Sequence, residues 1–364
     1  AINPGASLPN LRNDNNVTIA ELLGSNGYRT YLSGKWHLGP VSAQRDPISR
    51  GFMHAYGVGA NAAGDNVKNY WDISLYGLVS ENNEVTWDNY QGKRFHQTDA
   101  TGDYAVKFIE HNTQKGDGKP FFLYLAFNAA HWPVQGPAEI ADKYTDVADS
   151  NPDDVDYFNY EVGWDSARNY RFERQKQLGV VTDSYTLSPR GNAFNSSQPV
   201  EIPAWNTLDE KRKNDLARRM AVYAASVNQI DNNVKKVVDC LKANNQLENT
   251  MIIIVSDNGG NYENQVFGNP EARNPEDLAT MGQANDPPTF PRVDVGGGWA
   301  NLNNTPFRLF KHFTHEGGIR TPEIIFYPAG ITKPGTWVEQ PSHLIDVMAT
   351  VVDVTGSEYP QTFK

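Results

Sequence analysis

A lysine and a histidine stand two residues apart in the run Gly34-Lys-Trp-His-Leu-Gly39, directly after a segment that reads as a strand. Side chains at that spacing in an extended segment project to the same side, so we expect Lys35 and His37 to share a surface. Lys35 brings a fixed positive charge, and His37 brings a group that gives or takes a proton near neutral pH. The pair predicts a site that handles an anionic ester.

Three more polar clusters lie beside apolar runs that predict buried strands. In open parallel sheets, sites form at the carboxyl ends of the strands. We therefore expect these clusters to converge with Lys35 and His37 in one cleft. They are His131 after residues 121–127, Asp257 and Asn258 after residues 250–256, and Lys311 before residues 322–327.

The residue types of these clusters fit one chemistry. Asp257 and Asn258 offer a carboxylate and an amide oxygen, which are hard ligands for Ca²⁺ or Mg²⁺. The two lysines supply positive charge for an anionic group, and the two histidines hydrogen-bond an oxyanion or transfer a proton to a leaving group. The sequence shows neither a His/Cys cluster with zinc spacing nor a glycine-rich phosphate loop.

Helical and strand patterns alternate along the chain, which predicts an α/β fold with a mostly parallel sheet flanked by helices. No linker clearly separates two domains, so we expect one domain over residues 1–364. The apolar runs 121–127 and 250–256 are expected to be strands buried on both faces. Further predicted elements are a strand at 28–32, a third apolar strand at 322–327, helices at 18–25, 99–111 and 343–354, one bent helix or two helices at 208–245, a loop-rich insertion at 138–206 and an irregular segment at 259–304.

The composition limits the partners. The 364 residues carry a net charge of −11, which argues against nucleic acid and against an anionic membrane surface. No apolar run is long enough to span a bilayer, and the first residues do not form a signal peptide. The single cysteine, Cys240, lies in an apolar helical pattern, so we expect a buried side chain and no catalytic thiol.

Several motifs in the right order resemble the sulfatases, a family of the alkaline-phosphatase-like superfamily. Gly34 to Gly39 is similar to the second sulfatase signature, and Ser256-Asp-Asn-Gly is similar to the second half of the metal site. Lys311 stands five residues before Glu316-Gly-Gly-Ile-Arg-Thr-Pro, as the family's second lysine does. Further similar segments are Arg50-Gly-Phe, residues 122–133 and the late segment from His343, while Trp164-Asp-Ser-Ala-Arg and Asn304-Thr-Pro-Phe-Arg-Leu-Phe-Lys resemble the arylsulfatase branch.

The resemblance implies a sulfuric ester hydrolase, arylsulfatase-like, that in its full-length form cleaves sulfate monoesters with a calcium-assisted formylglycine nucleophile. It implies a sulfated small molecule or carbohydrate as substrate and a periplasmic or secreted location. Two alternatives stay open: a phosphate or phosphonate ester hydrolase of the same superfamily, and a non-catalytic sulfate-binding pseudoenzyme. The implied catalytic residues are Lys35, His37, His131 and Lys311, and the implied calcium ligands, with Mg²⁺ as the alternative ion, are Asp257 and Asn258.

The sequence departs from the family pattern at two places. Sulfatases carry a Cys/Ser-x-Pro-x-Arg motif, which supplies the nucleophile, and an Asp-Asp pair, and both precede the Gly-Lys-Trp-His motif. The 34 residues before Lys35 contain neither, and the chain stops soon after Gly356, where relatives continue into a smaller subdomain. We therefore expect an internal fragment, incomplete at both ends and inactive by itself.

Overall fold

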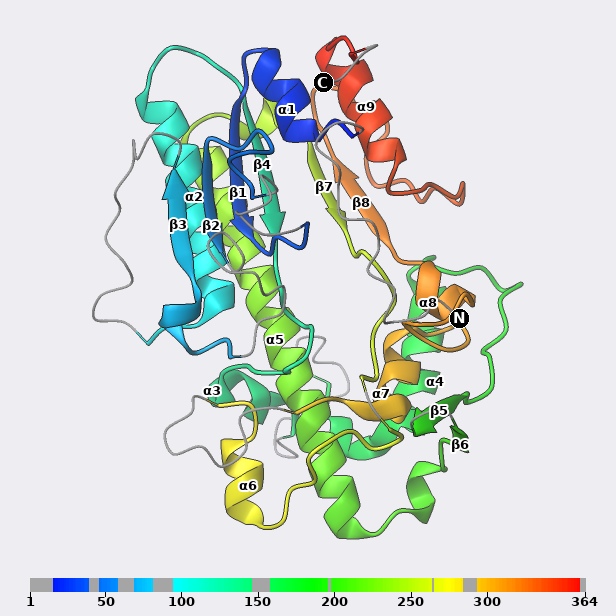
Figure 1. Cartoon of the computed structure of the whole chain (residues 1–364). Helices are drawn as coiled ribbons and strands as arrows, with labels where there is room; N and C mark the ends of the chain where they lie inside the picture. Colours follow the sequence, from blue (N-terminus) through cyan, green and yellow to red (C-terminus); the bar gives the residue numbers. More distant parts are fainter. Residues whose placement is uncertain are drawn as a thin grey trace. The chain divides into compact units, whose positions relative to one another are not determined.

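The structure is a computed structural model that describes residues 16–38, 46–57, 69–80, 94–145, 158–195, 198–263, 265–283 and 293–360. The chain divides into two compact units, which are described separately here (Figure 1). The first unit comprises residues 1–128, 229–247 and 340–364, and the second unit comprises residues 129–228 and 248–339. The predicted single domain over residues 1–364 stays a prediction.

The first unit contains a four-stranded mixed sheet in the order β3-β2-β1-β4 (Figure 1). Strand β1 pairs in parallel with both β2 and β4, and β3 adds an antiparallel edge. The elements of this unit are α1 (Ile19–Ser25), β1 (Arg29–Gly34), β2 (His54–Gly57), a 3-10 turn (Ile73–Leu75), β3 (Gly77–Ser80), α2 (Gln97–Gln114), β4 (Phe121–Ala126), the last part of α5 (Glu210–Ala243) and α9 (Asp346–Thr355).

Helices α1 and α2 pack on opposite faces of this sheet, because neighbouring residues of β1 point to opposite sides. Tyr31 stacks on Phe108 of α2 with ring centroids 5.1 Å apart. Leu32 belongs instead to a buried cluster with Ala20 of α1 and Trp36. The layered α/β arrangement that the sequence predicts is therefore present in the first unit.

Helix α1 begins where the sequence predicts, at a capping box. The Thr18 hydroxyl accepts a hydrogen bond from the Glu21 amide, and the Glu21 carboxylate accepts one from the Thr18 amide. The same carboxylate binds the buried Arg50 guanidinium at 2.8 Å. Arg50, part of a motif similar to the sulfatases, thus holds α1 against the segment that leads into β2.

The second unit contains helices, one hairpin and a separate two-stranded ribbon (Figure 1). Strands β7 and β8 form that ribbon and run antiparallel, with Val255 opposite Glu323. The elements are α3 (Ala138–Ala141), α4 (Gly163–Gln177), β5 (Asn192–Asn195), β6 (Gln198–Glu201), the first part of α5 (Glu210–Ala243), β7 (Ile252–Val255), α6 (Pro275–Thr280), α7 (Gly296–Asn303), α8 (Glu316–Ile319) and β8 (Glu323–Phe326), with 3-10 turns at Asp142–Tyr144, Tyr160–Val162, Trp205–Thr207 and Leu247–Asn249.

Three tryptophans form the centre of the second unit. Trp164 of α4 packs edge-on against Trp205 and Trp299, with ring centroids 4.9 Å and 5.7 Å away. The Trp299 indole N–H donates to the Leu216 carbonyl of α5 at 2.8 Å, so its one polar atom is satisfied in the core. A Cβ on Gly298 would meet the Trp164 ring at 2.4 Å, which explains a glycine at this position of α7.

Two local expectations are wrong. The segment 138–206 contains the 15-residue helix α4, which the sequence hides because most of its residues are polar. Strands β4 and β7, which the sequence predicts to be buried on both faces, are only partly buried: Tyr124 is 47% exposed, and Ile254 and Val255 are 42% and 40% exposed. The reason is their position, since each has a single neighbouring strand among the described residues, β1 for β4 and β8 for β7.

Helix α5 is one continuous helix of 34 residues, which decides between the two forms expected for residues 208–245. Its cysteine, Cys240, is buried, and burial raises the pKa of its thiol. The expectation of a buried Cys240 side chain is thereby confirmed. Among the described residues, no helix is long and apolar enough to cross a membrane.

Candidate active site

Lys35 stands at the carboxyl end of β1, where a close approach to β4 fixes its backbone. Its amide donates to the Ala126 carbonyl at 2.8 Å, which extends the ladder by one residue. Gly34 before it has φ +118°, and a Cβ there would lie 1.9 Å from the Ala126 oxygen. Only glycine fits this position, so the glycine of the motif sets the direction in which Lys35 leaves the sheet.

The next two residues alternate in burial. Trp36 is buried, with its ring edge-on to Phe52 at 5.8 Å, whereas Lys35 is half-buried and His37 is exposed. The indole thus anchors the motif in the core between the two polar side chains. This alternation agrees with the expectation that Lys35 and His37 share a surface.

In the second unit, a tight turn follows β7 and carries Asp257 and Asn258. The Ser256 hydroxyl donates to the Asn258 carbonyl at 2.9 Å. Gly259 donates to the Gly318 carbonyl at 3.0 Å, and a Cβ on Gly259 would lie 1.8 Å from the Gly317 oxygen. The two glycine pairs of Asp-Asn-Gly-Gly and Glu-Gly-Gly are therefore packed backbone against backbone.

Lys311 lies beside the same turn, although it is more than 50 residues further along the chain. Its amide donates to the Gly260 carbonyl at 3.1 Å, and the Asn304 side chain accepts from the Gly260 amide at 2.9 Å. The antiparallel ribbon explains this meeting, because the start of β8 lies opposite the end of β7. Lys311, which precedes β8 in the sequence, therefore lies at the same end of the ribbon as Asp257, which follows β7.

His131 is connected to the same segment through a carboxylate. Its Nδ1 lies 2.8 Å from the Trp132 carbonyl oxygen, to which it donates, and its Nε2 lies 3.8 Å from Glu263 Oε1. The amide of Glu263 in turn donates to the Asn261 side chain at 3.1 Å. The segment 257–263 thus carries the metal-ligand candidates Asp257 and Asn258 at one end, and at its other end Glu263 faces the His131 imidazole.

Glu263 and His312 were not among the site residues predicted from the sequence. Both have left-handed backbone, with φ values of +54° and +81°, as do Gln265 and Leu309 nearby. Such conformations are costly for residues other than glycine and often occur at functional sites. Burial and the adjacent Lys311 charge lower the pKa of His312, while Glu263 acts in the opposite direction. No sequence signal reveals these two residues, because neither backbone strain nor spatial proximity is visible in the sequence.

Asp257 and Asn258 are the side chains that would bind the metal ion implied by the resemblance. Asp257 is exposed and Asn258 is half-buried, and their oxygens are the type that Ca²⁺ prefers. Among the described residues, no group of three or more His, Cys, Asp or Glu side chains could hold a metal ion. The pair therefore fits as part of a calcium shell, which needs roughly 6 to 8 oxygens.

The six predicted site residues are divided between the two units: four of them lie in the second unit and two in the first. Asp257, Asn258 and Lys311 meet at one turn of the second unit, and His131 joins them through Glu263. Lys35 and His37 belong to the first unit, at the carboxyl end of β1. Convergence of all six residues in one cleft stays a prediction.

Comparison with known proteins decides the family. Residues 3–357 match the sequence model of the family described as Sulfatase. The chain belongs to the sulfatase family. Sulfatases are hydrolases that act on sulfuric esters, and the predicted membership and the alkaline-phosphatase-like α/β fold are confirmed.

Two curated relatives show how much of a sulfatase the chain represents. An uncharacterised sulfatase of Schizosaccharomyces pombe is 30% identical over 96% of this chain and 60% of its own length. The arylsulfatase of Klebsiella aerogenes is 27% identical over 94% of this chain and 68% of its own length. The chain thus spans about two thirds or less of the length of these relatives.

Solved structures agree on the fold. The structure of Ps i-CgsB in complex with k-i-k-neocarrahexaose has a TM-score of 0.51 and 22% identity, over 94% of this chain and 54% of that one. The structure of BT4656 in complex with D-glucosamine-2-N,6-O-disulfate has a TM-score of 0.50 and 20% identity, over 97% and 63%. At these identities the likeness concerns the fold alone.

Proposed function

We propose that this chain supplies most of the active site of an arylsulfatase-like hydrolase that cleaves sulfate monoesters. The observation that carries the proposal is the bonded turn in which the Lys311 amide meets Gly260, two residues after Asn258. A cationic side chain and two hard oxygen ligands at one turn suit a divalent ion and an anionic ester. The substrate we propose is a sulfated small molecule or carbohydrate, such as the two ligands seen in the related structures.

The proposed roles are those that the resemblance to the sulfatases implies, and the charges of the side chains are compatible with them. Lys35 and Lys311 neutralise the sulfate, and Lys311 also contacts the leaving-group oxygen. His131 contacts the sulfate, and because its Nδ1 donates to the Trp132 carbonyl, Nε2 is the nitrogen that we assign to this contact. His37 assists turnover of the sulfated nucleophile, for which the family resemblance implies a formylglycine. Asp257 and Asn258 would hold part of a Ca²⁺ shell, with Mg²⁺ as the alternative, and the bound ion would supply electrostatic stabilisation of the sulfate.

The nucleophile is proposed to come from sequence outside these 364 residues, because no Cys/Ser-x-Pro-x-Arg motif occurs among them. By the same resemblance, we place the protein in the periplasm or outside the cell. Loss of a covalent nucleophile costs about 10⁶ in turnover in a well-studied hydrolase. We therefore expect no measurable hydrolysis of an aryl sulfate by residues 1–364 alone.

The test is an aryl sulfate assay on a chain lengthened at its N-terminus by a sulfatase segment that carries the nucleophile motif and the Asp-Asp pair. We expect turnover that falls at least about a hundredfold in Lys35→Ala, His131→Ala or Asp257→Ala. The exposed Lys333→Ala is the matched control and should keep full activity. Turnover by residues 1–364 alone, or an active Lys35→Ala variant, would contradict the proposal.

A further inference from the structure

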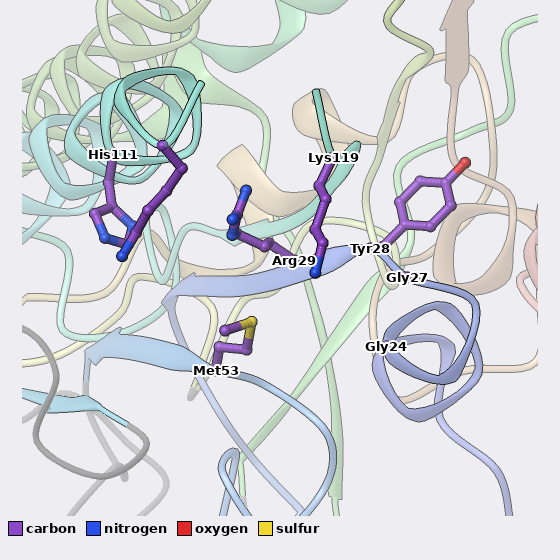
Figure 2. Close-up of a pocket in the computed structure, with 8 residues that line it drawn as sticks. Gly24, Gly27, Tyr28, Arg29, Met53, His111 and Lys119 are labelled. Carbon is purple, nitrogen blue, oxygen red and sulfur yellow. The ribbon is translucent and has the colours of Figure 1, made fainter. Parts of the chain in front are cut away.

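A cavity of about 290 Å³ lies in the first unit, at the end of the sheet where the parallel strands begin (Figure 2). Arg29 opens β1, Met53 directly precedes β2, and Lys119 stands two residues before β4. Lys35 is at the other end of β1, about 20 Å away along the strand. The cavity is therefore separate from the candidate active-site lysine. It is lined by Gly24, Gly27, Tyr28, Arg29, Met53, His111, Lys115 and Lys119.

The charged side chains that line this cavity are all cationic. Arg29, Lys115 and Lys119 carry positive charge, His111 adds a fourth basic side chain, and no carboxylate is among the lining residues. Figure 2 shows that these side chains come from the start of β1, the last turn of α2 and the loop before β4. A local positive excess in a chain of net charge −11 is a place where an anion concentrates.

The loop Lys115-Gly-Asp-Gly-Lys119 holds two of these cations in place. Gly116 and Gly118 have φ values of +65° and +71°, which allow a tight turn between the two lysines. Asp117 at the centre accepts two hydrogen bonds from the Arg29 guanidinium, at 2.9 Å and 2.6 Å. The Lys119 carbonyl accepts from the Asn112 side chain at 3.0 Å, so the loop is fastened to both β1 and α2.

Helix ends explain part of this charge, but not all of it. Helices α1 and α2 both end at the cavity, and each C-terminus carries roughly −0.5 of a charge that cations offset. Lys115 is the C-cap of α2 and His111 lies in its last turn, so these two residues fit that role. The Arg29 charge is balanced by Asp117, whose carboxyl pKa it lowers to about 2. Lys119 lies outside both helices and leaves a positive excess.

We propose that this cavity binds one tetrahedral oxyanion, sulfate or phosphate, between Lys115 and Lys119. The anion is either a free ion or the ester group of a single sugar. The cavity volume of about 290 Å³ is at the lower end of the range for ligand pockets, which begins at roughly 300 Å³. A longer oligosaccharide therefore does not fit inside the cavity. The site lies at the other end of β1 from Lys35, and it stands on the geometry of the first unit alone.

Calorimetric titration of residues 1–364 with inorganic sulfate, at constant ionic strength set with chloride, tests the proposal. The titration is made on a Lys35→Ala background, which removes one of the proposed active-site contacts, and the Lys115 and Lys119 variants distinguish this cavity from the remaining contacts at Lys311 and His131. We expect affinity in the millimolar range, about fivefold weaker in either Lys115→Gln or Lys119→Gln. Lys333→Gln, an exposed lysine of the second unit, is the control and should change nothing.

Parallel titrations distinguish the two sources of the anion. Binding of inorganic sulfate or phosphate without glucose 6-sulfate identifies a free ion, and binding of glucose 6-sulfate without glucose identifies an ester group. Either result supports the site. The proposal is overturned if none of the three anions binds in the millimolar range, if glucose binds as well as its sulfate, or if the Lys115→Gln, Lys119→Gln double variant binds as tightly as Lys333→Gln.

Discussion

The Lys311 amide donates a hydrogen bond of 3.1 Å to the Gly260 carbonyl, which links two segments that the sequence separates by 50 residues. This bond places the backbone of Lys311 next to the turn that carries Asp257 and Asn258. It depends on the antiparallel β7–β8 ribbon and on the contact between Gly259 and Gly317. The backbone position of Lys311 therefore depends on these backbone contacts, and a small shift of the backbone there should displace Lys311.

Gly259→Ala should disturb the backbone contact between Gly259 and Gly317. The added Cβ would lie 1.8 Å from the Gly317 oxygen, and backbone cannot move aside as a side chain can. We expect a loss of about 1–3 kcal/mol in the free energy of unfolding, measured with urea. Gly24→Ala is the control, because its Cβ would meet its nearest atoms at 3.9 Å and 4.0 Å. Equal stability of the two variants would show that the two backbones are not packed against each other.

Glu263→Gln should impair catalysis through His131 without disturbing the fold. The substitution keeps the shape and removes the charge that lies 3.8 Å from His131 Nε2. In the lengthened, active chain we expect kcat to fall about fivefold with little change in KM, as for loss of a partly exposed ion pair. Glu173→Gln, which removes an exposed pair with Lys176, is the matched control. A larger effect on KM than on kcat would instead assign Glu263 to substrate binding.

Local sequence patterns predicted most of the elements that carry the site. Apolar runs identified β4, β7 and β8, and 3.6-residue periodicity with a cap identified α1. These features depend on neighbouring residues only, which is why a single sequence reveals them. The motif glycines are visible in the sequence, but the reason for them is not local, because Gly34 lies against Ala126 and Gly259 lies against Gly317.

What the sequence did not predict depends on distant partners. Helix α4 was missed because its buried positions, such as Trp164 and Phe172, are separated by polar residues that hide the periodicity. The antiparallel direction of β8 was missed because strand composition does not encode direction. Glu263 was missed because its relation to His131 arises only when residues 132 positions apart are folded together.

Calcium should bind weakly to residues 1–364. Asp257 and Asn258 supply two of the roughly 6 to 8 oxygens that the ion needs, so we expect a Kd on the order of 10⁻⁴ to 10⁻³ M. Asp257→Ala should abolish this binding in calorimetry, whereas the exposed Asp183→Ala should not. Micromolar affinity would mean that further acidic residues of the chain complete the shell.

The β7–β8 ribbon should promote self-association of the chain. In the second unit, Ile324, Ile325 and Phe326 are 59%, 44% and 41% exposed, and exposed apolar strands recruit other strands. Sedimentation velocity should therefore show concentration-dependent association that Ile325→Lys reduces. Val338→Lys changes an equally apolar residue outside the ribbon and should leave the association unchanged. A monodisperse wild-type monomer would contradict this prediction.

Asp294 should make the fold less stable as the pH rises. Burial raises the pKa of its carboxyl to about 7, against the lowering effects of the Asn269 amide and Arg219. An unfolded aspartate has a pKa near 3.9, so between about pH 4 and pH 7 the folded chain binds the extra proton. The contribution of Asp294 is therefore fully present below about pH 4, is lost as the pH rises through about 7, and is constant above that.

Asp294→Asn keeps the shape of a neutral Asp294 at every pH, so the comparison isolates this one group. We expect the unfolding free energy of the wild type, relative to the variant, to fall by a few kcal/mol between about pH 4 and pH 7, with about 4 kcal/mol as the upper bound. Urea unfolding across this range measures it, and Asp353→Asn, an exposed aspartate, should show no such fall. A wild type that gains stability relative to Asp294→Asn over the same range would show that the carboxylate is charged in the fold and that Arg219, not burial, dominates its environment.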